Sequence, residues 1–257
     1  MRRALVPMLR EDRVLRGTWA QIRAPELVDM IGVAGFDFAI IDCEHGAFGI
    51  ETAETLIRAC DAAGIAPALR VSRLDEVEIM KALDAGAGAV VVPNIETPDQ
   101  AARAVAATRF APDGRRGACP CCRAGGHFIT DWETYRARQH AETGAIVLVE
   151  TLAGARAFEQ IIRVPGLAAV MLGPFDLSVS MGHHGNWKEP DVQAQLHRMV
   201  DLALAANLPL ILPVFASPPA ENRKLIELWQ GRGIRGFAIG ADKIIVSDAL
   251  RKWASHD

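Results

Sequence analysis

The segment FDFAIIDCEHGAFG, residues 36 to 49, passes from an apolar run straight into two carboxylates, a thiol and an imidazole. An imidazole titrates near neutral pH, so His45 in its glycine-flanked turn is a candidate acid or base. The charges of Asp42 and Glu44 would raise the pKa of Cys43, which disfavours this thiol as a nucleophile. We therefore expect His45 to transfer protons, with Asp42 and Glu44 as possible supports for it or for the surroundings of a metal.

Two further carboxylates follow apolar runs in the second half of the chain. Glu150 closes AIVLVE at 145 to 150, and Asp176 comes shortly after LAAVML at 167 to 172. Two adjacent carboxylates suit a hard divalent cation such as Mg²⁺ or Mn²⁺, which keeps waters or substrate oxygens in its remaining positions. The alternative is that both residues cap helices and are solvated.

Lysine occurs only at positions 81, 188, 224, 243 and 252, and none of these ends an apolar run. Schiff-base chemistry needs a desolvated lysine in the pocket and is therefore disfavoured. Activation of a carbonyl group would then have to come from a metal acting as a Lewis acid. Arg70, near the end of APALRV at 66 to 71, suits a substrate carboxylate or a developing enolate oxygen, with a structural ion pair as its alternative role.

The elements that would position these groups follow a repeating pattern of apolar runs and amphipathic stretches. Runs that are apolar on both faces and alternate with helices indicate a parallel sheet covered by helices, because parallel strands need crossovers. The runs lie at 14–19, 36–41, 66–71, 89–93, 145–150, 167–172, 210–215 and 236–240. The helical patterns lie at 25–34, 51–63, 76–85, 98–108, 153–163, 192–206, 219–229 and 244–254.

Eight such units in 257 residues predict an α/β fold, the (β/α)8 TIM barrel, as a single domain over residues 1–257. An open doubly wound sheet usually has fewer strands, and no GxGxxG motif follows the first run. Two segments interrupt the repeat: an excursion of loop and helix at 110–143 and an insertion at 182–191. Long loops inside a compact domain tend to be functional or interfacial.

Barrel enzymes place their chemistry where the strands end, which makes the polar residues there a shortlist. Trp19, after the first run, is expected to serve packing or to form a wall of the substrate pocket. The other positions are Asp42, Glu44, His45, Arg70, Asn94, Glu96, Glu150, Gly173, Pro174, Phe175, Asp176, Ser217, Gly240, Ala241 and Asp242.

The composition and net charge limit the kinds of partner that we expect. The net charge is −3 with both signs spread along the chain, so we expect neither nucleic acid nor a membrane surface as a partner. No apolar stretch reaches the length of a spanning helix and no signal-like core develops, which predicts a cytoplasmic protein that acts on small molecules. Cys119, Cys121 and Cys122 lack the paired spacing of a structural zinc site even with His127 nearby, so we expect reduced thiols.

With these positions laid out, the sequence resembles the HpcH/HpaI aldolase and citrate lyase family, in particular its class II pyruvate aldolases of the 4-hydroxy-2-oxoheptane-1,7-dioate type. The matching segments cover nearly the whole chain and are specific in combination. They are FDFAIIDCEHG at 36–46, LR at 69–70, VPNIET at 92–97, RRG at 115–117, RA at 123–124, VET at 149–151, GPFDLS at 173–178, MGHHGN at 181–186 and GAD at 240–242.

The resemblance implies roles for individual residues. A divalent cation, Mg²⁺, Mn²⁺ or Co²⁺, would sit on Glu150 and Asp176 and be chelated by the carboxylate and keto oxygens of a 2-oxo acid. Arg70 would stabilise the enolate and carbonyl oxygens, and His45 would take the C4 hydroxyl proton, directly or through a water. Asp84 is implied to raise the basicity of the histidine, although its place before the fourth strand points to the other end of the barrel.

Main-chain amides at Phe175 and Asp176, after Gly173 and Pro174, would hold the pyruvate carboxylate. The implied activity is that of an aldehyde-lyase, which reversibly cleaves 4-hydroxy-2-oxo acids to pyruvate and an aldehyde through a metal-bound pyruvate enolate. Relatives are usually homo-oligomers, so the resemblance also implies a hexamer or trimer.

Two positions depart from the family pattern. Leu148 stands where many relatives have glutamine, and Phe175 stands where alanine is frequent. The metal and enolate chemistry therefore transfers better than the aldehyde specificity. His183 and His184 in the insertion are expected at the surface or an interface, or to narrow the aldehyde side of the pocket.

Two other functions stay open. A lyase of malyl or citramalyl coenzyme A would need a basic surface for the nucleotide, for which only Arg115, Arg116 and Arg123 cluster. A non-catalytic barrel could bind a 2-oxo acid, but it would have no reason to keep the histidine, arginine and two carboxylates together at the strand ends.

Overall fold

Eight parallel strands close into a barrel in the computed structural model, which describes residues 3–215 and 219–255. Each strand pairs with the next along the chain, and β8 pairs with β1. This confirms the (β/α)8 architecture. The strands are β1 Leu15–Ala20, β2 Phe38–Asp42, β3 Ala66–Arg70, β4 Ala89–Val92, β5 Ala145–Val149, β6 Ala169–Leu172, β7 Leu210–Val214 and β8 Gly236–Ala241.

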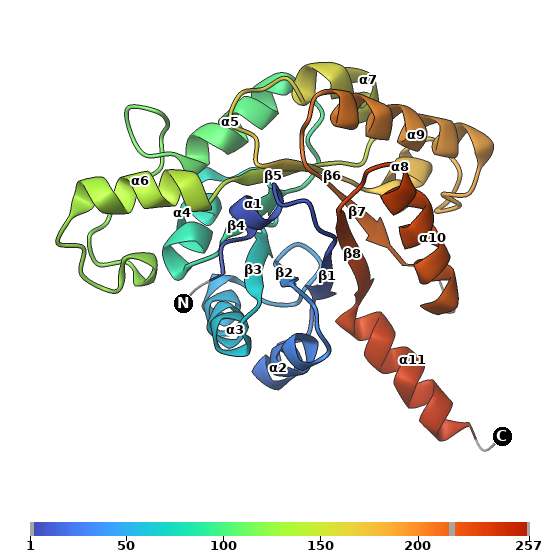
Figure 1. Ribbon diagram of the computed structural model, residues 1–257, viewed down its shortest axis with the longest axis horizontal. Coiled ribbons are helices and arrows are strands. Elements are labelled where there is room, and N and C mark those ends of the chain that lie inside the picture. Colours follow the sequence, from blue (N-terminus) through green and yellow to red (C-terminus); the bar gives the residue numbers. More distant parts are fainter. Residues whose placement is uncertain (1–2, 216–218, 256–257) are drawn as a thin grey trace.

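Helices follow the strands and form the outer layer (Figure 1). Most begin with a good N-terminal signal; for example, Thr97 and Gln100 form a capping box at the start of α5. The α-helices are α1 Leu5–Met8, α2 Pro25–Val33, α3 Ile50–Ala63, α4 Glu76–Ala85, α5 Pro98–Thr108, α6 Trp132–Glu142, α7 Leu152–Ile161, α8 Pro174–Ser180, α9 Pro190–Ala205, α10 Pro219–Gly231 and α11 Asp242–Ala254, with a 3₁₀ turn η1 at Arg123–Gly125.

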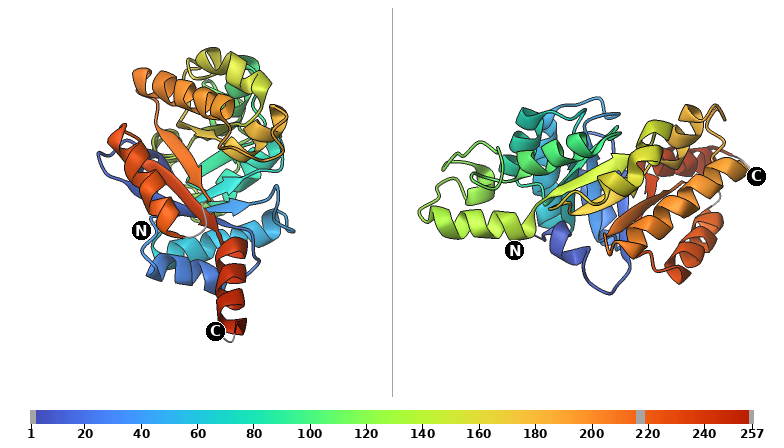
Figure 2. Two further views of the ribbon diagram at one scale, coloured as in Figure 1. Left: turned by 90° about the vertical axis from the view of Figure 1, so that its right-hand side faces the viewer. Right: turned by 90° about the horizontal axis from the view of Figure 1, so that it is seen from above.

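The last helix, α11, extends away from the body of the barrel toward the C-terminus (Figures 1 and 2). Its exposed face carries large apolar side chains, among them Ile245, Leu250 and Trp253. Across the described ranges, 3–215 and 219–255, no helix is both long enough and apolar enough to cross a membrane.

Strand alternation divides the core in two. Side chains such as Ile40, Ala68 and Leu148 point into the barrel and join α1 in one apolar cluster, while Ile41 and Val147 point outward against the helices. Successive side chains of a strand face opposite sides. The same alternation places the inward positions at the strand ends around the mouth of the barrel, where β2 ends in Asp42, β3 ends in Arg70 and Glu150 follows β5.

The predicted strands lie within two residues of the observed ones, and the predicted helices also match with small shifts at their ends. Two helices, α1 and α8, were not predicted. Both are short and carry no extended amphipathic period. The excursion at 110–143 contains η1 and α6, the insertion at 182–191 ends in the start of α9, and Ser217 lies outside the described residues.

Candidate active site

Arg70 is held rigidly at the barrel mouth by Asp42 on the neighbouring strand. The two residues are paired in the β2–β3 register, so their inward side chains meet. Arg70 Nε donates to Asp42 Oδ1 at 2.8 Å and Nη2 donates to Oδ2 at 2.6 Å. Both side chains are buried. Burial raises the pKa of Asp42, but the hydrogen bonds and charge of Arg70 outweigh it and leave that pKa below its usual value.

Further contacts fix this pair. Asp42 Oδ2 also accepts from Gln21 Nε2 at 2.7 Å, and the guanidinium of Arg70 lies over the ring of Trp19 with 4.3 Å between Cζ and the centroid. Arg70 Nη1 forms an ion pair with Glu44 Oε2 at 2.9 Å. The guanidinium therefore has one orientation and keeps further N–H donors for a ligand.

Glu150 lies at the end of β5 with one oxygen engaged. Its Oε1 accepts from the main-chain N–H of Asn94 at 3.0 Å, and only 5% of the residue is exposed. Burial raises the pKa of Glu150 to about 7; the N–H of Asn94 opposes the rise, and the charges of Asp176 and Glu44 add to it. The site thus gathers more negative charge than its own arginine compensates.

Gly173 allows Glu150 to reach this position. A Cβ at Gly173 would lie 2.5 Å from Glu150 Cβ and 2.8 Å from its Oε2. Three residues later, in the first turn of α8, the exposed side chain of Asp176 faces the same cavity. The carboxylates of Glu150 and Asp176 form no salt bridge with any residue in the described part of the chain.

These two carboxylates fit a divalent cation. Oxygen donors without a cationic partner suit Mg²⁺ or Mn²⁺, which complete their coordination with substrate oxygens and water. Within 3–215 and 219–255, no group of three or more histidine, cysteine, aspartate or glutamate side chains is arranged to hold a metal. A two-carboxylate site is consistent with that result, because its open positions remain for the substrate.

His45 stands at the rim. Its main-chain N–H donates to Asp42 Oδ1 at 3.2 Å, which ties the turn after β2 to the arginine pair. The side chain is exposed and lines the same cavity as Arg70 and Glu150. Cys43 beside it is partly buried, and burial followed by the charges of Asp42 and Glu78 raises its pKa to about 12, which leaves the thiol protonated at neutral pH.

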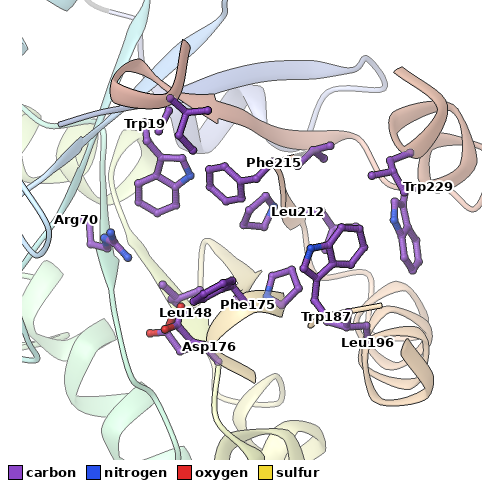
Figure 3. Close-up of a pocket in the computed structure, with 18 of the residues that line it drawn as sticks. Trp19, Arg70, Leu148, Phe175, Asp176, Trp187, Leu196, Leu212, Phe215 and Trp229 are labelled. Carbon is purple, nitrogen blue, oxygen red and sulfur yellow. The ribbon is translucent and has the colours of Figure 1, made fainter. Parts of the chain in front are cut away.

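The cavity over these residues measures about 510 Å³ and runs from the barrel mouth toward α9 and α10. Figure 3 shows Arg70 and Asp176 on one side, Trp187 and Trp229 on the other, and Phe175 between them. Trp19 also lines it, and its buried indole Nε1 has no hydrogen-bond partner within the described residues.

Comparison with known proteins gives the family. A model of the HpcH/HpaI aldolase/citrate lyase family matches residues 16–246. The chain belongs to this family. It is 33% identical to a hydroxypyruvate/pyruvate aldolase of Chromohalobacter salexigens over 93% of this chain and 92% of that protein. It is 32% identical to a 5-keto-4-deoxy-D-glucarate aldolase of Salmonella arizonae, over 96% and 93% respectively.

The same family is found by structure. A crystal structure of an HpcH/HpaI aldolase/citrate lyase family protein from Burkholderia cenocepacia J2315 superposes with a TM-score of 0.88 and 31% identity, covering 97% of this chain and 96% of that one. The closed barrel described above is therefore shared with a solved structure of the same family.

Most site residues expected in this HpcH/HpaI family chain converge on one cavity. Trp19, His45, Arg70, Glu150 and the turn from Gly173 to Asp176 all line it. Asp42 and Glu44 support Arg70 from behind and from the side. Asp84 is not among the lining residues; it lies near the end of α4, where its Oδ1 accepts from Arg116 Nη2 at 2.8 Å. Its proposed action on His45 stays a prediction.

Two supporting residues were missed or undervalued by sequence reasoning. Gln21, which bonds Asp42, follows β1 as an ordinary polar residue and gives no sequence signal. Asn94 was only one of several strand-end residues, yet it donates its main-chain N–H to Glu150 and its side-chain Nδ2 to Glu44 Oε1 at 3.3 Å. The sequence signal that could have been used is asparagine itself directly after an apolar run, because asparagine adopts a positive φ, 56° here, more readily than most residues.

Proposed function

We propose that this chain is a divalent-metal-dependent aldolase that cleaves 4-hydroxy-2-oxo acids to pyruvate and an aldehyde, and joins them in the reverse direction. The observation that carries the proposal is what lines one cavity: a fixed guanidinium, Arg70, together with two carboxylates without salt bridges, Glu150 and Asp176. This arrangement suits a small anionic 2-oxo acid together with a cation.

Glu150 and Asp176 would hold the cation, Mg²⁺ or Mn²⁺. Bound there, it supplies Lewis-acid polarisation of a carbonyl group. The chain provides no lysine in its place, since none is among the described residues that line the cavity. Without such a lysine no Schiff base can activate the carbonyl group, so the proposed mechanism depends on the metal.

The protein's own groups provide charge stabilisation, orientation and proton transfer. Arg70, already oriented by Asp42, directs positive charge at the oxygen that becomes negative when pyruvate loses a methyl proton. The main-chain N–H groups of Phe175 and Asp176 lie in the first turn of α8, where they lack intrahelical acceptors, and would donate to the carboxylate of pyruvate. His45 at the rim would take the C4 hydroxyl proton in cleavage, directly or through a water.

The test is exchange of the methyl protons of pyruvate with solvent. Purified protein with Mg²⁺ or Mn²⁺ in D₂O should incorporate deuterium at the pyruvate methyl group, as followed by NMR, and EDTA should abolish the exchange. Exchange with no added metal after complete chelation, or no exchange with any divalent ion, would contradict the proposal.

Single-residue variants test the roles proposed for Glu150, Asp176 and Arg70. Glu150→Ala and Asp176→Ala should each abolish binding of Mn²⁺ as measured by calorimetry. Arg70→Ala should keep Mn²⁺ bound and lose exchange by about 100-fold or more, a typical effect of removing an oxyanion-stabilising group. Near-normal exchange in the Arg70 variant would remove its assigned role.

The alternatives receive less support. Of the three arginines that a coenzyme A lyase would use, Arg115 is exposed, but the other two are engaged internally: Arg116 bonds Asp84 and Gln139, and Arg123 bonds Asp61 and the carbonyl of Ala85. These side chains are therefore not arranged as a surface for a nucleotide. A binding barrel without catalysis is distinguished by the exchange experiment, since it would bind pyruvate without exchanging its protons.

A homo-oligomer, hexamer or trimer, is also proposed. The exposed apolar side chains of α11 support association, because an apolar face of this kind is usually covered by protein. Light scattering on the purified protein measures the state directly, and a monomer at micromolar concentration would contradict it.

A further inference from the structure

The cavity has two ends of opposite character. Figure 3 shows Arg70 and Asp176 at one end, over the barrel mouth, and His45 and Glu150, which follow β2 and β5, line the same cavity. The rest of the cavity is bounded by side chains from the loop after α8, from α9, from β7 and from α10. We call it the apolar chamber, defined by Trp187, Leu196, Leu212, Phe215, Leu225 and Trp229. Pyruvate is small and needs only the charged end, so the apolar chamber remains for the second substrate.

The tryptophan that closes the apolar chamber is fixed by its loop. The main-chain carbonyl of Trp187 accepts from Gln193 Nε2 at 2.7 Å, and its N–H donates to the carbonyl of Gly185 at 3.0 Å. Gly185 has a φ of +88°, and a Cβ there would lie 2.6 Å from the ring of Phe175. This glycine therefore lets the loop lie against Phe175, which places Trp187 over the cavity.

The opposite wall is equally fixed. Trp229 is 8% exposed, and its ring packs against that of His197, with 4.8 Å between centroids, and against the guanidinium of Arg232 at 5.2 Å. Neither His197 nor Arg232 is among the described residues that line the cavity, so these polar groups do not form part of its wall. The chamber offers an aromatic surface on this side.

Charged and amide groups are scarce inside the chamber. Among the described lining residues on this side, Gln193 is the single side-chain amide, and its Nε2 is already bonded to Trp187; lysine and arginine are absent there. Burying a carboxylate or several hydroxyl groups without partners is strongly unfavourable, whereas burying apolar area contributes roughly 25 cal/mol per Å². Leu148 extends the apolar wall inward to the charged end.

We propose that the aldehyde used by this enzyme carries an uncharged apolar side chain, aromatic or branched aliphatic, which occupies the apolar chamber. The inference rests on the proposed aldolase function. In the synthetic direction pyruvate loses a methyl proton to a base, a carbon–carbon bond forms between that carbon and the aldehyde carbonyl carbon, and the aldehyde oxygen takes up a proton to become the C4 hydroxyl. The R group of the aldehyde is unchanged and selects the substrate.

The first experiment compares aldehydes of similar size with the Mn²⁺-loaded enzyme and pyruvate. Benzaldehyde, phenylacetaldehyde and 3-methylbutanal are matched against succinic semialdehyde and glyceraldehyde, and product formation is measured by mass spectrometry. The apolar aldehydes should have kcat/KM values at least tenfold higher. Equal or faster reaction of the carboxylated or hydroxylated aldehydes would overturn the inference.

A second readout does not depend on turnover. Calorimetry should show that 2-oxo-4-phenylbutanoate binds the Mn²⁺-loaded enzyme at least tenfold more tightly than 2-oxoadipate, which ends in a carboxylate instead of a ring. Trp187→Gln should remove most of this preference, and Trp187→Phe should restore it. Phe128→Gln, at an exposed aromatic side chain that does not line the cavity, is the control and should leave the preference unchanged.

The two proposals fail in different ways. If pyruvate exchange is normal in the wild type and in Trp187→Gln, but the phenyl compound has no advantage, the apolar-aldehyde inference is wrong and the aldolase function stands. If the wild type shows no metal-dependent exchange, both proposals are wrong.

Discussion

At the scale of single residues, the site is defined by unequal compensation of charge. Arg70 is paired twice, with Asp42 and with Glu44, while Glu150 and Asp176 have no salt-bridge partner in the described chain, and burial raises the pKa of Glu150. A fixed arginine side chain beside carboxylates that have no salt bridge is the arrangement expected where a metal ion and an anionic substrate bind together. The conformation of Arg70 therefore depends on Asp42, which does not itself line the cavity.

Asp42→Asn should release Arg70 while leaving Mn²⁺ binding intact. The amide cannot accept both guanidinium hydrogen bonds, so the variant leaves a buried charge partly unpaired and should lose about 2 kcal/mol of stability. Pyruvate exchange should fall at least tenfold, and calorimetry with Mn²⁺ should be unchanged. Glu44→Gln removes the same charge from the half-buried partner, so it is the control and should have a smaller effect. Equal losses in both variants would contradict the special role of Asp42.

Glu150 predicts a pH dependence of stability in the metal-free protein. Its pKa in the folded state is about 7, above the ordinary value of 4.5, so the folded protein binds the proton more tightly than the unfolded chain. The contribution to stability is fully present below pH 4.5 and is lost as pH rises through about 7, amounting to at most about 3 kcal/mol. Denaturant titrations should show this loss in the wild type, and Glu150→Gln should flatten the curve.

At the scale of elements, the alternation of strand side chains brings the site together. Asp42, Arg70 and Glu150 end or follow three strands at inward positions, so closing the barrel brings them to one end. Short loops then adjust the geometry: the turn at Asn94 supplies an N–H to Glu150, and the start of α8 approaches Glu150 closely enough to require glycine.

Gly173→Ala should therefore disturb metal binding more than folding. The added methyl group would overlap the side chain of Glu150, and relieving it would move either the carboxylate or α8, which carries Asp176. Overpacking of this kind costs about 1–3 kcal/mol. Affinity for Mn²⁺ should fall at least tenfold in calorimetry. Gly49→Ala is the matched control, because its Cβ would meet no atom within 4 Å; an equal loss there would rule out the explanation.

At the scale of the whole molecule, the apolar core that stabilises the barrel and the polar groups of the candidate site lie in different parts of the fold. Its interior below the mouth is apolar and closed by α1, and the polar groups gather at the other end. A cation that binds only the folded state should stabilise the whole domain by mass action, by about 2.7 kcal/mol at one hundred times the dissociation constant. The melting temperature of the wild type should rise by several degrees with Mn²⁺. That of Asp176→Ala should start near the wild-type value, since the side chain is exposed, and should not rise.

The sequence by itself determined the architecture and most of the site. Eight apolar runs alternating with capped helices predict a closed parallel barrel. Parallel strands are joined by crossover helices, and these helices cover strands that are apolar on both faces. The strand ends then pointed to Glu150, Asp176, Arg70 and His45, since a strand's last residues reach the mouth whichever neighbours it has. Local periodicity was sufficient for the architecture, whereas residue chemistry and the family resemblance selected these four residues among the strand ends.

Only the tertiary structure decided which groups pair with which. The bond from Gln21 to Asp42 and the bonds from Asn94 to Glu150 and Glu44 join residues on different loops, so no local pattern encodes them. The apolar chamber has the same origin: Trp187 and Trp229 come from separate segments and become one surface when α9, α10 and β7 pack together. Spacing along the chain fixes where each strand ends, whereas side-chain contacts across the mouth depend on barrel closure and on the conformations of the loops.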